Sequence, residues 1–159
     1  MKVLRGELDG TGLRVALVAA RFNESVTTAL VQGALEGLAR AGVDDDDVLV
    51  IWVPGAFEIP IVAHRLAAHG HVDAVVCLGA VIRGETAHFE LVAAEAARGI
   101  GEVSRTTGVP CIFEVLATED LAAAQARAGG AHGNKGWEAA ASAIEMVRLL
   151  QQLPSGTSA

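Results

Sequence analysis

Four short runs of apolar residues, many of them β-branched, constrain the fold of this chain more than any other feature of its sequence. The runs are Leu13–Ala19, Val48–Val53, Ala74–Leu78 and Cys111–Leu116. Each run is apolar almost throughout, whereas a strand with one face in water would alternate apolar and polar residues. We therefore predict four strands that are buried on both faces, as the strands of a parallel sheet are.

Segments with a helical spacing of apolar residues separate these runs. The predicted helices are Ser25–Ala41, Phe57–His69, Ala87–Thr106, Glu119–Ala128 and Gly136–Leu150. Asn23 is the predicted N-cap of the first helix, because its side chain can accept a bond from a free backbone N–H. Strands that alternate with helices form βαβ units and a parallel sheet. The pattern therefore predicts an α/β fold, a three-layer α/β/α sandwich around a flavodoxin-like open sheet with four parallel core strands.

No internal repeat or linker divides the chain, so we predict a single domain over residues 1–159. Within it, residues 1–12 are predicted to form an N-terminal arm and residues 154–159 a flexible tail. The acidic run Asp44–Asp47 is predicted to be a solvated surface turn, since it lacks the spaced Asp and the closing Glu of a calcium-binding loop.

The composition contains more apolar surface than one small domain can bury. Hydrophobic residues make up 52% of the 159 residues, and 18 more residues are Gly. The longest apolar run, Ala74 to Ile82, is about half of the roughly 18 residues that a membrane-spanning helix needs. Because small domains keep much of their chain at the surface, the surplus predicts a homo-oligomer with large interfaces.

Charge and cysteine content limit the kinds of binding partner and the cell compartment that we expect for this protein. The net charge of −7 argues against binding to nucleic acid or to an anionic membrane, since both attract clustered Lys and Arg. The N-terminal residues lack the apolar core of a signal peptide, so we expect a cytoplasmic protein. Cys77 and Cys111 lie in apolar runs and are predicted to be buried free thiols. His69 and His71 have no third ligand nearby, so no metal site is predicted.

Ligands of open α/β sheets bind outside the carboxyl ends of the strands, and these ends supply most candidate site residues. They are Phe22 after the first strand, Ala56, Phe57 and Glu58 after the second, and Ala80, Val81, Ile82, Glu85, Thr86 and His88 after the third. The segment Gly79–Thr86 is predicted to be a loop in which Gly79 and Gly84 let the backbone approach a ligand. Glu85 and Thr86 are predicted to open the next helix, whose free N–H groups favour an anion. His88, in its first turn, is expected to be a neutral proton acceptor.

Further candidates lie in and after the fourth strand. Phe113 and Phe22 could stack a planar ring near the carboxyl edge of the sheet. Arg127 and Lys135 could hold a phosphate group. Each candidate also has an ordinary structural explanation, such as core filling for an aromatic ring or a helix cap for a residue at a helix start. Taken one at a time, these residues leave both interpretations open.

Four segments together resemble the lumazine synthase family, whose members make 6,7-dimethyl-8-ribityllumazine in the penultimate step of riboflavin biosynthesis. The matching segments are Arg21–Asn23, Val53–Pro60, Leu78–Phe89 and, around one loop, Arg127–Gly129 with Gly133–Gly136. They follow the family's order and spacing over about residues 8–150. Four segments in register favour the functional interpretation of the candidate residues over the structural one.

The resemblance implies the condensation of 5-amino-6-(D-ribitylamino)uracil with 3,4-dihydroxy-2-butanone 4-phosphate, with release of phosphate and water and without a metal or organic cofactor. The residues implied to hold the uracil substrate are Phe22, Ala56, Phe57, Glu58, Ala80, Val81, Ile82 and Phe113. Those implied to hold the butanone phosphate are Glu85, Thr86, Arg127 and Lys135, with His88 as the catalytic proton carrier. By the same resemblance, Phe113, Arg127 and Lys135 reach the site from a neighbouring subunit.

The resemblance also implies an assembly. Members of the family form pentamers, and some join twelve pentamers into a hollow icosahedral shell of 60 subunits. The short loop Gly129–Gly136 is similar to that of shell-forming members, so we favour the shell, with riboflavin synthase as a further partner. The segment Lys2–Leu8 is expected to add a strand to a neighbour's sheet.

Three other functions remain open from the sequence. A flavodoxin-like carrier of FMN would show a stoichiometric flavin spectrum. A cage protein that has lost catalysis would form no product. A riboflavin synthase of the archaeal kind, which shares the fold, would act on a different set of substrates.

Overall fold

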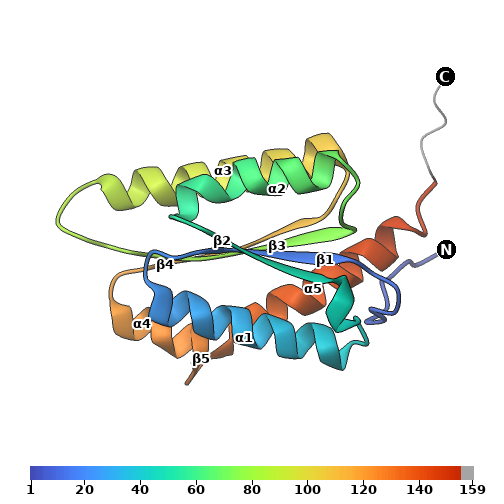
Figure 1. Ribbon diagram of the computed structural model, residues 1–159, viewed down its shortest axis with the longest axis horizontal. Helices are drawn as coiled ribbons and strands as arrows, with labels where there is room; N and C mark the ends of the chain where they lie inside the picture. Colours follow the sequence, from blue (N-terminus) through green and yellow to red (C-terminus); the bar gives the residue numbers. More distant parts are fainter. Residues whose placement is uncertain (155–159) are drawn as a thin grey trace.

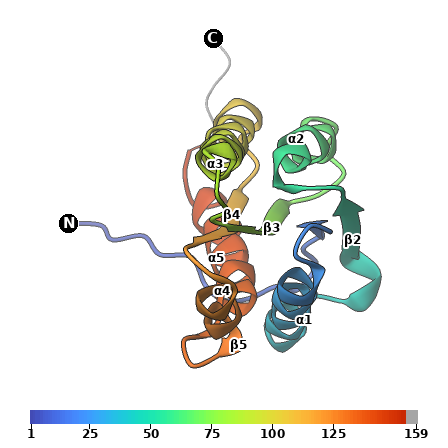
Figure 2. The ribbon, with the colours of Figure 1, turned by 90° about the vertical axis from the view of Figure 1, so that its left-hand side faces the viewer.

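The computed structural model describes residues 1–154, which form a four-stranded parallel sheet between two layers of helices (Figure 1). The strands are β1 (Val15–Ala20), β2 (Val48–Val53), β3 (Ala74–Ile82) and β4 (Cys111–Thr118), in the spatial order β2-β1-β3-β4. Helices α2 (Ile59–Ala68) and α3 (His88–Thr107) cover one face of the sheet, and α1 (Glu24–Arg40), α4 (Leu121–Arg127) and α5 (Lys135–Leu150) cover the other (Figure 2). The predicted sandwich with four parallel core strands is confirmed. Apart from Pro154, the predicted tail over residues 154–159 lies outside the described residues.

The central strand β1 explains why the apolar runs are continuous. All six of its residues are buried. Leu17 and its alternate neighbours pack with α1 and α5, whereas Val18 and its alternate neighbours pack with α2 and α3. Since successive side chains of a strand point to opposite faces, a central strand between two helix layers is apolar at every position. The prediction that all four strands are buried on both faces is wrong for the edge strands, because β2 and β4 both leave large apolar side chains exposed.

The structure corrects the predicted end of the third strand. β3 does not end at Leu78, because Gly79 to Ile82 continue the parallel pairing with Val115 to Thr118 of β4. A Cβ atom on Gly79 would lie 3.2 Å from the Val115 side chain and 3.5 Å from Cβ of Ala56. Gly79 therefore serves the packing of β3, and the loop before α3 is confined to residues 83–87.

The helix starts also differ from expectation. α3 begins at His88, so the prediction that Glu85 and Thr86 open this helix is wrong. Asn23 precedes α1 but makes no side-chain cap bond; its backbone is left-handed, with φ of 61°.

Short elements complete the chain. They are the 3-10 turns η1 (Asp45–Asp47) and η2 (Ala56–Glu58), and an antiparallel pair of β5 (Ala128–Gly130) and β6 (Gly133–Asn134). The predicted acidic surface turn is thus a 3-10 turn, and the side chain of Asp44 caps it. The pair β5–β6 lies where an irregular loop was predicted, between α4 and α5.

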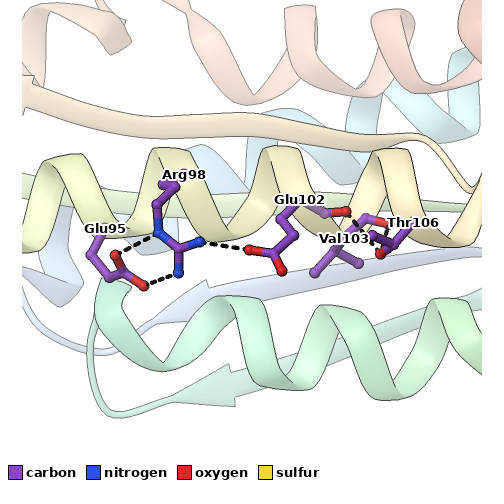
Figure 3. Close-up of polar contacts among 5 residues, drawn as sticks. All are labelled: Glu95, Arg98, Glu102, Val103 and Thr106. Atoms are coloured by element: carbon purple, nitrogen blue, oxygen red, sulfur yellow. Dashed lines mark hydrogen bonds and ion pairs between the residues drawn. The ribbon is translucent and has the colours of Figure 1, made fainter.

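Helix α3 combines a packed face with a charged one. Gly99 packs so closely on α2 that a Cβ atom there would lie 2.7 Å from Cγ of Pro60. On the exposed face, the Arg98 guanidinium bridges Glu95 and Glu102, with N–O distances of 2.6 Å to each carboxylate (Figure 3). These pairs lie one helical turn apart on either side of Arg98, as expected for neighbours on a helix surface.

The first residues of the N-terminal arm project away from the rest of the molecule, and the arm then reaches α5 (Figure 2). Arg148 donates hydrogen bonds of 2.7 Å to the backbone carbonyls of Asp9 and Thr11, and Gln152 donates one of 2.6 Å to that of Arg5. The strand that Lys2–Leu8 would add to a neighbour's sheet stays a prediction. None of the helices within residues 1–154 is long and apolar enough to cross a membrane.

Candidate functional site

A cavity of about 680 Å³ lies at the carboxyl ends of β1, β2 and β3, and we call it the first cavity. Its polar side chains are Glu58, Thr86 and His88, and the rest of its wall is apolar. A mostly apolar hollow with a few converging polar groups is the usual form of a small-molecule site. The lining residues are Phe22, Pro54, Gly55, Ala56, Phe57, Glu58, Ala80, Val81, Ile82, Gly84, Thr86, His88, Phe89 and Val92.

Backbone and side-chain bonds hold Phe22 at one wall of this cavity. The Phe22 N–H donates a bond of 3.2 Å to the carbonyl of Pro54, which joins the end of β1 to the end of β2. The side-chain amide of Asn23 donates a bond of 2.7 Å to the carbonyl of Ala80, which joins β1 to β3. The Phe22 ring is 72% exposed, so these bonds fix its backbone and leave the ring free to contact a ligand.

The turn η2 forms a second wall. Glu58 N–H bonds the carbonyl of Gly55 at 3.2 Å and closes the turn. The Glu58 carboxylate lies over Gly55, since a Cβ atom on that glycine would be 3.1 Å from Oε2. Ala56 is buried, whereas the Phe57 side chain is 57% exposed. The turn therefore offers one carboxylate and one aromatic ring to the cavity.

The start of α3 forms the third wall. The hydroxyl oxygen of Thr86 accepts a bond of 3.3 Å from the backbone N–H of His88. This contact caps a free N–H of the helix, so Thr86 does act as a cap, while its side chain still lines the cavity. His88 is the first residue of α3 and is exposed.

Arg83 holds in place the loop of residues 83–87, which carries Thr86. Its guanidinium bonds the Glu119 carboxylate at 2.8 Å, pairs with Glu90 of α3 and lies 4.6 Å from the centre of the Phe89 ring. The hydrogen bond from Arg83 lowers the pKa of Glu90. Glu85 does not line the first cavity; it lies beside Arg83 in a neighbouring shallow depression.

The remaining predicted residues line a second cavity, of about 560 Å³, along the edge strand β4. Phe113, Arg127 and Lys135 lie there and not in the first cavity. Phe113 is the third residue of β4 and pairs with Cys77, so it lies away from the carboxyl edge of the sheet. Phe22 and Phe113 of one chain therefore line different cavities.

Both cations of the second cavity are held by neighbouring groups. Nη1 of Arg127 donates a bond of 2.8 Å to the carbonyl of Ala123, one turn earlier in α4. Nζ of Lys135 lies 2.7 Å from Oε2 of Glu138, one turn later in α5. Asn134 caps α5 by accepting a bond of 2.8 Å from the N–H of Gly136.

Three kinds of residue at these cavities were not predicted from the sequence. Phe89 and Val92 line the first cavity one helical turn apart on α3, and their spacing after His88 was an available signal. Asn23 was assigned to a cap, although it binds Ala80 across the sheet. Glu114, the charged residue within an apolar strand, lines the second cavity; burial raises its pKa to about 7.

The two cysteines confirm the prediction of buried free thiols. Burial raises the pKa of Cys111 to about 11 and that of Cys77 well above its usual value. His69 and His71 stack their rings 6.0 Å apart, and within residues 1–154 no group of three or more His, Cys, Asp or Glu could hold a metal ion.

The chain is similar in sequence to a known protein family. The family model described as 6,7-dimethyl-8-ribityllumazine synthase matches residues 12–151. The match spans all four core strands and every residue that lines the two cavities.

Proposed function

The chain belongs to the 6,7-dimethyl-8-ribityllumazine synthase family, and we propose that it condenses 5-amino-6-(D-ribitylamino)uracil with 3,4-dihydroxy-2-butanone 4-phosphate. The family consists of transferase-type enzymes of riboflavin biosynthesis. The observation that carries the proposal is the first cavity, in which an exposed aromatic ring, a carboxylate and an imidazole converge on one apolar hollow.

The uracil substrate has a planar ring and a polyhydroxylated chain, and the first cavity offers a partner for each. The Phe22 ring stacks on the planar ring, and the Glu58 carboxylate accepts bonds from hydroxyls of the ribityl chain. Ala56 and Phe57 complete this wall. Backbone groups of Ala80, Val81 and Ile82, at the end of β3, face the edge of the ring.

The phosphate of the second substrate binds at the start of α3. Glu85 and Thr86 contribute backbone N–H groups in the turn just before the helix, where the helix dipole also favours an anion. Arg127 and Lys135 of a neighbouring copy supply the positive charge, because in one chain they lie in the other cavity. The neighbour's Phe113 ring closes the ring pocket in the same way.

The proposed reaction needs proton transfers but no electron transfer. The 5-amino group attacks the ketone and one water leaves, which gives an imine. A proton is removed beside the imine and phosphate leaves from the neighbouring carbon. The enol that is left takes up a proton at its terminal carbon, loses its hydroxyl proton and becomes a methyl ketone. The remaining amine then attacks this new carbonyl, and a further water leaves as the ring closes. His88 moves the protons, and neither a metal nor an organic cofactor takes part.

Both substrates are reactive by themselves, so the site works mainly by holding them together. Proximity and orientation can supply a large share of a rate enhancement when two reactants are held in the correct geometry. The bonds that join the ends of β1, β2 and β3 make the first cavity rigid enough for that purpose.

Because the proposed site uses residues of both cavities, we propose an assembly in which the second cavity of one copy meets the first cavity of the next. A head-to-tail contact gives a ring when its rotation closes, and we propose a closed pentamer, with twelve pentamers in an icosahedral shell. Exposed Ile61 of α2 and Leu91 of α3, 73% and 69% exposed, supply apolar surface for such contacts. The protein is proposed to be cytoplasmic, with riboflavin synthase as a partner. Light scattering tests the shell, and a mass near five subunits would refute it.

The activity is tested by supplying the two substrates to the purified protein. We expect one inorganic phosphate to be released for each lumazine formed, with no added metal or cofactor. Absence of product from a folded assembly would refute the synthase. Conversion of the lumazine alone to riboflavin would favour the archaeal kind of riboflavin synthase, and a stoichiometric flavin spectrum would favour an FMN carrier.

A further inference from the structure

Glu114 places a carboxylate on a strand face between two apolar residues. Ile112 and Leu116, two positions before and after it in β4, pack into the core layer with α1 and α5. Because side chains alternate along a strand, Glu114 projects to that same face. Its position at the edge of the sheet lets its side chain line the second cavity. A partly buried carboxylate needs either a cation or a proton, since burial penalises its charge.

Lys135 is paired with one carboxylate and shares the second cavity with another. Lys135 is paired with Glu138, at 2.7 Å, and its positive charge also acts on Glu114. The charged groups that line the second cavity with Glu114 are Lys135 of α5, Arg127 of α4 and Glu119 after β4, and the charge of Glu138 in α5 also acts on Glu114. The residue beside it on β3 is the uncharged Leu78.

Among these groups, Lys135 is the one able to respond to Glu114. Arg127 is bound to the carbonyl of Ala123 at 2.8 Å, and Glu119 is bound to Arg83 at 2.8 Å. Lys135 ends in a compact charge on a flexible stem with three donors, so its ammonium can turn between two carboxylates and a ligand.

We propose that Glu114 is a positioning residue that competes with an anionic ligand for the Lys135 ammonium and thereby sets the affinity of the site for phosphate. The inference rests on the proposed function, in which Lys135 binds the phosphate of a substrate. When Glu114 is ionised, it draws Lys135 toward β4 and offsets its charge. When Glu114 is neutral, Lys135 retains one carboxylate partner and attracts the ligand more strongly.

The competition depends on pH. Burial raises the pKa of Glu114 to about 7, while the charge of Lys135 lowers it and that of Glu138 raises it. Glu114 is therefore mostly ionised at pH 8 and mostly protonated at pH 6. Anion affinity is expected to rise as the pH falls through this range.

Sulfate is a suitable probe because, unlike phosphate, it keeps the same charge between pH 6 and pH 8. Its dissociation constant is measured calorimetrically on the assembled protein at both pH values. Glu114→Gln should bind sulfate about fivefold more tightly than the natural protein at pH 8 and almost equally at pH 6. Glu36→Gln, which removes an exposed carboxylate of α1, is the matched control and should change neither value.

A kinetic measurement gives the second readout. At pH 8, Glu114→Gln should lower the KM for the butanone phosphate by a similar factor, with little change in kcat. Failure of the natural protein to form lumazine would refute the proposed function, whereas the sulfate measurement would still test the competition. Equal sulfate affinities for Glu114→Gln and the natural protein at both pH values would overturn the inference.

Lys135→Gln keeps the proposal falsifiable if the substitution of Glu114 prevents folding. Without the ammonium group, the proposal predicts that protonation of Glu114 no longer strengthens sulfate binding. The gain in sulfate affinity between pH 8 and pH 6 should therefore shrink in Lys135→Gln. An undiminished gain in that variant would also overturn the inference, because the effect would then not pass through Lys135.

Discussion

His88 and Arg127 belong to different cavities of one chain, and we expect their replacement to change different kinetic constants. His88 lies at the wall of the first cavity, on the first residue of α3. Arg127 lies in the second cavity, at the end of α4. A proton carrier affects the rate of turnover, whereas a counter-charge for phosphate affects binding of that substrate.

Replacement of His88 by Ala is expected to lower kcat by roughly 10²- to 10⁴-fold, the usual contribution of one acid–base group. Activity above the uncatalysed rate should persist, because the cavity still holds the two substrates together. Steady-state kinetics of the assembled variant measure both. His71→Ala, at an exposed histidine outside both cavities, is the matched control. Complete loss of activity with an intact assembly would argue against a mechanism based mainly on proximity.

Replacement of Arg127 by Ala is expected to raise the KM for the butanone phosphate by roughly 10- to 100-fold, the effect of losing a hydrogen bond to a charged group. The KM for the uracil substrate should change little. Arg40→Ala, at the exposed end of α1, removes the same charge elsewhere. An unchanged KM for the phosphate substrate would remove Arg127 from the phosphate site.

Among the helices, α5 shows how an element positions a site residue. Asn134 caps this helix and also donates a bond of 2.9 Å to the carbonyl of Ala29 in α1. The neighbouring Gly136 packs so closely on α1 that a Cβ atom would lie 1.9 Å from the carbonyl oxygen of Leu30. The start of α5, and with it Lys135, is therefore held against α1.

Replacement of Asn134 by Ala removes both contacts and is expected to lower the free energy of unfolding by about 1–2 kcal/mol. It should also raise the KM for the phosphate substrate, because Lys135 is the next residue. Urea denaturation and steady-state kinetics measure the two effects. Asp44→Ala removes a cap from the exposed turn η1 and should leave this KM unchanged. A stable variant with unchanged KM would show that Asn134 does not position Lys135.

The whole molecule leaves large apolar side chains in water. Phe22, Phe57 and Phe113 are 72%, 57% and 44% exposed in the single chain. Part of the large apolar content of the chain therefore lies on its surface, in residues that line the two cavities. An assembly that joins these cavities would cover this surface and complete the site in one step.

Mixed assemblies provide the sharpest test of a site shared between copies. When His88→Ala and Arg127→Ala chains are co-expressed in equal amounts, about a quarter of the sites should combine two unaltered halves by random assortment. Co-assembly should therefore restore activity toward about a quarter of the natural value. Homogeneous assemblies of each variant, mixed after purification without subunit exchange, are the control. No gain upon co-assembly would show that both residues act within one chain.

The arrangement of strands and helices could be predicted because it depends on neighbouring residues. Each continuous apolar run forms a strand of the sheet, and the residues after it lie at the carboxyl edge. Phe22 and His88 could therefore be assigned to one edge without coordinates. Burial on both faces does not follow from the run alone, because Leu49 and Trp52 of the edge strand β2 are 48% and 37% exposed. The end of β3 was misjudged because Gly79 was taken for a loop residue, although its lack of a side chain serves packing against Val115.

The amino-acid sequence by itself determined the four strands, the helix layers and the residues at the carboxyl ends, because apolar periodicity acts over a few residues. Only the tertiary structure decided which candidates share a cavity, since Phe113 and Lys135 are brought together by the packing of β4 and α5. It alone decided that Asn23 binds Ala80 and that Glu114 lines the same cavity as Lys135. Such contacts depend on how segments that are distant in the sequence pack together. The same packing excludes water from a charged group and so changes its pKa.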